Sequence, residues 1–190
     1  MNDQNITKEE AWSLLFLLRA DEFYILTRYS YCAFLQYSPF RLAHHALEYY
    51  LKSGLSHFIT LKQLKSFGHK VTDLWKEYRC HTPNVTLDDR VVEHIDCFES
   101  MRYPGGDKFA RTAWGLPYQD LFDNIMPNVS QDARDSLACF SMEDIDHIVY
   151  ILRSSIPHGD KLPFNTLGED QERYLFHENK YFTKKENEKN

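Results

Sequence analysis

The stretch Phe40-Arg-Leu-Ala-His-His-Ala-Leu-Glu-Tyr-Tyr-Leu-Lys-Ser-Gly-Leu55 decides the fold of this chain. Apolar and small residues recur in it at spacings of three and four, as they do on one face of an α-helix. These residues are Ala43, Ala46, Leu47, Tyr50, Leu51, Gly54 and Leu55. The small ones allow a neighbouring helix to pack closely against this face. The stretch therefore predicts one helix of a packed helical bundle.

Helical periodicity extends over most of the chain, and we find no alternating pattern typical of a β-strand. We expect the quoted helix to run from Ser38 to about His57, and four other segments also carry an apolar face. These segments cover about 8–36, 69–80, 87–103 and 142–156. The sequence therefore predicts an all-α protein, an antiparallel up-and-down bundle of about five helices.

Residues at the expected helix starts support these boundaries. The capping-box spacing, a Ser or Thr with an acidic residue three positions later, occurs three times. The pairs are Thr7 with Glu10, Thr86 with Asp89, and Ser141 with Asp144. We interpret Asp146, like Asp144, as a charge that favours the N-terminal end of a helix.

The bundle is expected to span residues 1–160, with an irregular insertion at 104–140 before the last long helix. Gly, Pro and aromatic residues are frequent in this insertion, which favours a flap packed on the bundle. Residues 161–190 hold few apolar anchors, so we expect a loop-like C-terminal extension that ends in a charged, flexible tail.

The composition limits the class of protein. With 190 residues, of which 43% are hydrophobic and 26% charged, the chain fits one globular domain. The net charge of −6 argues against a broad grip on nucleic acid, which needs clustered Lys and Arg, but it permits a small basic cleft. We find no apolar run long enough for a membrane span and no signal peptide, so we expect a cytoplasmic protein with free cysteines.

Three short motifs follow one another in an informative order. Glu48 and Lys52 lie four residues apart on the expected second helix. Gly68-His69 precedes the third helix, and Arg102-Tyr103-Pro104 ends the fourth. In this order the motifs resemble the HEPN family (higher eukaryotes and prokaryotes nucleotide-binding), over roughly residues 10–156.

Many HEPN proteins are RNases that use an Arg followed, after four to six residues, by a His. The Arg stabilises charge on the phosphate, and the His moves the proton of the RNA 2′-hydroxyl. Arg102 stands at the matching place, but no His follows it in that window. The resemblance therefore implies a non-catalytic, homodimeric module that binds a nucleotide or RNA without a cofactor and accompanies a nucleotidyltransferase-type protein.

The candidate binding residues gather in segment 102–111, which is rich in Arg and Lys. Its two glycines permit a close approach of a ligand, and the flanking aromatic residues are suited to base stacking. The candidates there are Arg102, Tyr103, Lys108 and Arg111, to which the other motifs add Lys52 and His69.

Two other functions stay open at this point. Arg153 and His158 repeat the RNase spacing at the end of the last long helix. They would make the chain a metal-independent endoribonuclease. Alternatively, the long first helix and the aromatic insertion would form the surface of a structural dimerisation or interaction domain.

The sequence also contains two groups of potential metal ligands. His44 and His45 are adjacent on a helix, so their side chains should point about 100° apart and not readily share one ion. A second group lacks the tightly spaced second pair of a structural zinc site. It comprises Cys80, His81, His94 and Cys97. We therefore predict no bound metal.

Overall fold

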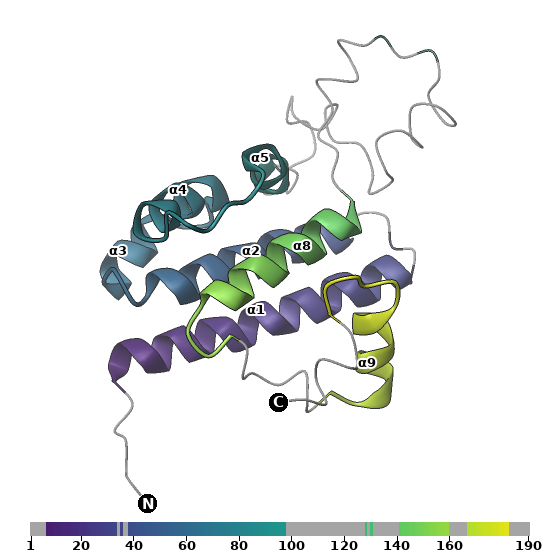
Figure 1. Cartoon of the computed structure of the whole chain (residues 1–190), viewed down its shortest axis with the longest axis horizontal. Helices are drawn as coiled ribbons and strands as arrows, with labels where there is room; N and C mark the ends of the chain where they lie inside the picture. The colour runs from purple at the N-terminus through teal and green to yellow at the C-terminus, as the bar shows by residue number, and fades with distance from the viewer. Residues whose placement is uncertain are drawn as a thin grey trace, which may run out of the picture.

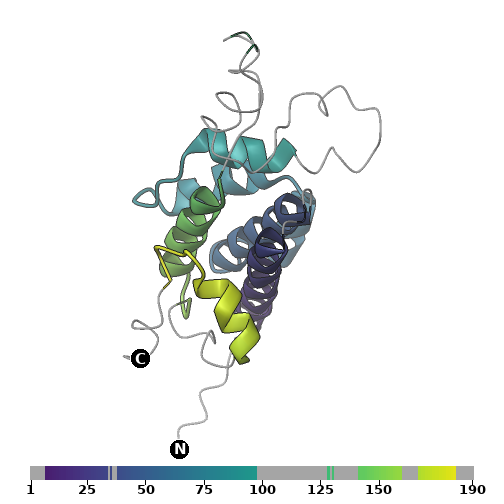
Figure 2. The same ribbon diagram turned by 90° about the vertical axis from the view of Figure 1, so that its right-hand side faces the viewer.

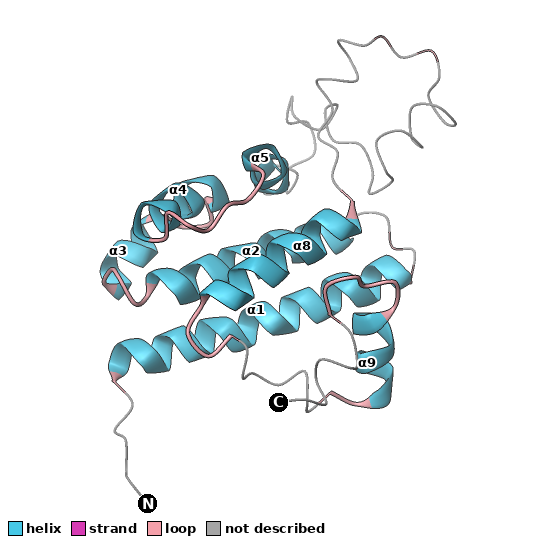
Figure 3. Cartoon of the chain, viewed as in Figure 1, coloured by secondary structure: helices cyan, strands magenta, loops and turns pink. Residues whose placement is uncertain are grey.

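The computed structural model describes residues 7–33, 35, 38–97, 128, 130, 141–159 and 167–182. Within these residues every regular element is a helix (Figure 3), which confirms the all-α prediction. The helices are α1 (Lys8–Cys32), α2 (Ser38–Leu55), α3 (Leu61–Ser66), α4 (Val71–His81), α5 (Asp89–Cys97), α8 (Met142–Ser155) and α9 (Glu169–Phe176).

Helices α1 and α2 form a long antiparallel pair (Figure 1). Ser13, near the start of α1, bonds Ser53 near the end of α2, whereas Phe23, later in α1, contacts His45, earlier in α2. The 25 residues of α1 give it a length of about 37 Å. No helix in the described ranges combines the length and apolar character needed to cross a bilayer.

Helix α8 packs along this pair and is antiparallel to α1. Arg28, late in α1, pairs with Asp146 at the start of α8, whereas Asp21 pairs with Arg153 near its end. Helices α4 and α5 cover one side of the pair, and α9 lies beside α1 on the opposite side (Figures 1 and 2).

The apolar face of α2 lies in the core, as its spacing predicts. All seven small and apolar residues of that face are buried, from Ala43 to Leu55. Gly54 permits a close approach, because a Cβ atom at this position would overlap the ring of Tyr78 on α4. Tyr78 is itself buried, so the contact sets the distance between α2 and α4.

Several helix boundaries differ from those that the sequence predicts. The capping boxes at Thr7 and Ser141 are formed, but α1 ends at Cys32 rather than near residue 36. α5 begins at Asp89, later than predicted, and the capping box predicted at Thr86 is not formed, because the carboxylate of Asp89 accepts hydrogen bonds from Trp75 and Arg79 instead. The short helix α3 was not predicted, since its six residues show too little periodicity.

The expectation of loop from residue 161 onward is wrong for the segment that forms α9. Leu175 is fully buried, and Tyr174 packs edge-on against Tyr29 of α1. After the helix ends, the buried Asn179 donates to the hydroxyl of Tyr24 and to the carbonyl of Leu175. These contacts attach α9 to the bundle. The insertion at 104–140 and the tail at 184–190 lie outside the described residues, apart from positions 128 and 130.

Candidate functional site

A buried carboxylate on α2 lies at the centre of the candidate site. The ammonium group of Lys52, one helical turn later, donates to Glu48 Oε1 at 2.6 Å. His69, which precedes α4, places its Nδ1 atom 3.1 Å from both oxygens of Glu48. His45 Nδ1 lies 3.6 Å from Glu48 Oε2. Lys52 and His69, which the sequence selects from separate motifs, therefore meet at one side chain.

The charge of Glu48 is stabilised by these neighbours. Burial alone would raise the pKa of Glu48, but the interactions with His45, Lys52 and His69 outweigh burial and lower the pKa to about 2. Glu48 is therefore an anion at neutral pH, held in a position that solvent barely reaches.

The chain turn before α4 brings His69 back over α2. Gly68 has a φ of +59°, in the left-handed region that favours glycine, and its carbonyl accepts a hydrogen bond from Lys52. Asp96 of α5 then caps α4, because its carboxylate accepts from the backbone N–H groups of Val71 and Thr72. The end of α5 thus lies beside the start of α4.

The adjacent histidines of α2 lie closer together than the sequence suggests. His44 is buried and His45 is half-buried, with ring centroids 5.5 Å apart. Ligand atoms of His44, His45 and Glu48 all lie within 4.8 Å of one another. Asp96 Oδ1 lies 3.5 Å from His44 Nε2. Burial would raise the pKa of Asp96, but His44, Thr72 and the capped N–H groups lower it to about 2.

The second group of potential metal ligands, namely Cys80, His81, His94 and Cys97, does not form a cluster. In the part of the chain that the structure describes, the cluster on α2 is the one group of three such residues whose ligand atoms converge. Cys80 is exposed and His81 pairs with Glu77 on its own helix.

The four candidates of segment 102–111, namely Arg102, Tyr103, Lys108 and Arg111, lie outside the described residues. Arg102 follows the last residue of α5, Cys97, by five positions in the sequence.

Arg153 and His158, the alternative catalytic pair, have different surroundings. The buried guanidinium of Arg153 contacts both oxygens of Asp21, with Nε 3.0 Å from Oδ1 and Nη2 3.3 Å from Oδ2. His158 is exposed, has a φ of 65°, and acts electrostatically on Glu10 and His57 near the start of α1 and the end of α2. Arg153 thus has a structural ion pair, whereas His158 faces solvent.

Two buried groups of one Tyr, one Asp and one Arg join the helices, and the sequence predicts neither. In the first, Asp21 accepts from Tyr50 at 2.6 Å and from Arg153. In the second, Asp146 accepts from Tyr24 at 2.6 Å and pairs with Arg28 at 2.7 Å.

The interpretation of Asp146 as a helix-terminal charge is therefore incomplete, since the residue is buried and ion-paired. Burial raises the pKa of Asp146 to about 6, even though Arg28 and Tyr24 favour the carboxylate. The sequence offers no signal for this, because the partners Arg28 and Asp146 are far apart along the chain.

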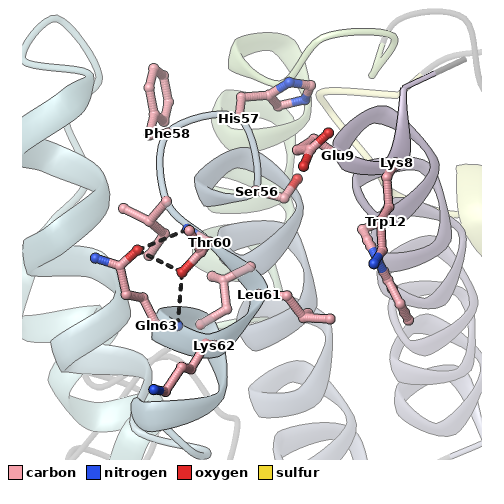
Figure 4. A pocket seen from close by; sticks show the side chains of 12 residues that line it. Lys8, Glu9, Trp12, Ser56, His57, Phe58, Thr60, Leu61, Lys62 and Gln63 are labelled. Carbon is pink, nitrogen blue, oxygen red and sulfur yellow. Dashed lines mark hydrogen bonds between the residues drawn. The ribbon is translucent and has the colours of Figure 1, made fainter.

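A pocket of about 470 Å³ lies between the start of α1, the end of α2 and α3 (Figure 4). Trp12, Phe58 and Leu61 supply much of its apolar lining. His57, at its edge, approaches Ser13 Oγ at 2.8 Å, and burial lowers the pKa of His57. Ser13 also bonds Ser53, so the hydrogen bonds of Ser13 join α1 to α2. The candidate residues in the described ranges do not line the pocket.

We compared the chain with protein-family models, with curated proteins and with solved structures. None of the three comparisons finds a match.

Proposed function

We propose that this chain is a non-catalytic, HEPN-like module that binds a nucleotide or RNA. The observation that supports this proposal best is the meeting of Lys52 and His69 at Glu48, because each residue belongs to a different motif of the resemblance. The same resemblance suggests a nucleotidyltransferase-type partner and a cytoplasmic location.

The geometry around Glu48 favours an anionic ligand. Lys52 is held by two hydrogen bonds, to Glu48 and to the Gly68 carbonyl, so a phosphate would meet a cation that is already oriented. The His69 side chain is 56% exposed and that of the neighbouring Lys70 is 75% exposed. Both can therefore contact a phosphate from the solvent side.

Segment 102–111 would supply the remaining charge. Glu48 neutralises part of the Lys52 charge, so the described residues alone would bind a polyanion weakly. The proposal therefore assigns Arg102, Lys108 and Arg111 to the same site, with Tyr103 as a stacking partner. The position of Asp96, which caps α4 next to His69, supports this because segment 102–111 follows α5 closely in sequence.

Binding of short, labelled single-stranded RNA, measured by fluorescence anisotropy over a range of salt concentrations, tests the proposal. We expect weak binding that decreases as salt rises, and no cleavage product. Lys52→Ala and Arg102→Ala should each weaken binding and reduce the slope of log affinity against log salt by about 0.7. Lys62→Ala, an exposed lysine of α3, is the matched control and should leave binding unchanged.

Two results would contradict the non-catalytic proposal. One is equal affinity of the wild type, Lys52→Ala and Arg102→Ala. The other is metal-independent cleavage of RNA that stops in His158→Ala, which would establish the endoribonuclease alternative instead.

The exposed face of α1 favours a second candidate function, dimerisation. Leu15, Leu18 and Leu26 are between 43% and 53% exposed. At 100° per residue they fall within one narrow strip of the helix, with Glu22 between them. Exposed leucines on one face of a long helix are typical of an interface.

Leu18→Glu should therefore convert a dimer to a monomer, because it replaces an apolar contact of this strip with a second negative charge one helical turn from Glu22. Sedimentation equilibrium measures the change. Leu35→Glu, an equally exposed leucine beyond the end of α1, should leave the dimer intact. A wild-type chain that sediments as a monomer at high concentration would exclude this interface.

A further inference from the structure

We propose that His44, His45 and Glu48 of α2 bind a zinc ion, with His69 as the fourth ligand. This inference goes beyond the proposed function and does not depend on it. Imidazole and carboxylate groups are common zinc ligands, and three of the four residues already lie within 4.8 Å of one another.

Two distances from Glu48 Oε2 are close to those between the ligand atoms of a tetrahedral ion. With zinc–nitrogen and zinc–oxygen bonds of about 2.0–2.1 Å, the ligand atoms of a tetrahedral site stand roughly 3.3 Å apart. Glu48 Oε2 is 3.1 Å from His69 Nδ1 and 3.6 Å from His45 Nδ1. His69 is not among the residues whose ligand atoms all lie within 4.8 Å of one another, so its exposed side chain would turn toward His44 and His45 to complete the set. Lys52 binds the other oxygen, Oε1, and so leaves Oε2 to the ion.

The surroundings of the cluster also fit a metal site. Asp96 Oδ1 lies 3.5 Å from His44 Nε2, in the position from which a carboxylate orients a metal-binding imidazole. His44 and Glu48 are buried, whereas His45 is 24% and His69 56% exposed at the side chain. The ion would therefore enter from the side of His45 and His69 and would join the turn before α4 to α2.

Lys52 makes the zinc proposal separable from nucleotide binding. Its ammonium charge repels a divalent cation bound to the neighbouring oxygen of Glu48. Lys52→Met should therefore tighten zinc binding, whereas the proposed function requires the same variant to weaken RNA binding. The two proposals can fail independently, because RNA binding is measured with a chelator present and zinc binding without RNA.

The test uses the full-length chain without a histidine tag, stripped of metal and titrated with Zn²⁺ against a chromophoric chelator. We expect one zinc ion per chain. His45→Ala, His69→Ala and Glu48→Gln should each raise the dissociation constant at least 10-fold, and Asp96→Asn, which keeps a capping oxygen, roughly 10-fold. Co²⁺ in place of Zn²⁺ should show the visible absorption of tetrahedral coordination.

His81→Ala is the matched control, because His81 also pairs with an acidic residue on its own helix. The His81→Ala variant should bind zinc with the same affinity as the wild type. His45 and His69 are the decisive positions, since both are partly exposed and their variants should fold, which circular dichroism can verify. Absence of zinc binding by the wild type overturns the proposal, as does equal affinity of the wild type, His45→Ala and His69→Ala.

Discussion

Arg153→Met is expected to lower the free energy of unfolding by about 3–5 kcal/mol, because it leaves the carboxylate of Asp21 buried without its cation. Both side chains of this ion pair are only 8% exposed, and the guanidinium contacts both carboxylate oxygens. Tyr50 continues to donate to Asp21 but brings no charge. Urea unfolding monitored by circular dichroism measures the loss.

A double variant separates the ion pair from general damage to the core. Asp21→Asn combined with Arg153→Met removes both charges and keeps an acceptor for Tyr50, so it should be more stable than Arg153→Met alone. Lys180→Met, which breaks an exposed pair with Glu143, should change stability little. An Arg153→Met variant as stable as the wild type would show that Asp21 does not depend on this cation.

This result also bears on the endoribonuclease alternative. Arg153 variants are expected to be less stable, so a loss of RNA cleavage in one of them would not identify a catalytic group. His158 is exposed and has no comparable structural contact among the described residues, which makes His158→Ala the more informative variant.

The parts of the fold that the sequence predicts are those encoded by local spacing. The apolar face of α2 and the capping boxes of α1 and α8 depend on residues within one or two helical turns, and all are present. α3 and α9 are too short for a periodic signal, and α9 is attached by contacts from the distant residues Tyr24 and Arg28.

The sequence selects Lys52 and His69 as candidates but does not show that both side chains contact Glu48. Lys52 and His69 could be selected by motif, whereas the contact of His69 with Glu48 depends on the left-handed turn at Gly68. Adjacent side chains on a helix point about 100° apart, which argues against a shared ion at His44 and His45. In the structure, however, the ligand atoms of the two side chains lie within 4.8 Å of each other. Buried ion pairs such as Arg28–Asp146 were not predictable, because no local pattern relates their partners.

Arg28→Met is the second substitution with a large expected effect, about 3–5 kcal/mol on the free energy of unfolding. Arg28 has two roles in the buried region between α1, α8 and α9. It pairs with Asp146 at 2.7 Å, and it donates to the backbone carbonyls of Tyr174 and His177 at the end of α9. Methionine fills the volume but satisfies neither the carboxylate nor the carbonyls.

The loss of stability in Arg28→Met should also be concentrated in α9. Amide hydrogen exchange in α9 should accelerate more in Arg28→Met than exchange in α2, because α9 depends on Arg28 for its C-terminal carbonyls. Arg90→Met, which removes an exposed arginine that pairs with Asp88, is the matched control and should leave both helices protected. Uniform acceleration of α2 and α9 would contradict this role of Arg28.

Substitution of Asp146, the acidic partner of Arg28, should change stability differently. Asp146→Asn should cost less than Arg28→Met at neutral pH, because burial opposes the Asp146 charge and raises the pKa from 3.8 to about 6. At a pH between these two pKa values the folded chain holds more protons than the unfolded chain. The contribution of Asp146 to stability is therefore fully present below about pH 4 and is lost as the pH rises through 6. The stability advantage of the wild type over Asp146→Asn should therefore shrink from pH 4 to 7, by roughly 3 kcal/mol at most. An advantage that grows with pH would show that attraction to Arg28 outweighs the desolvation of Asp146.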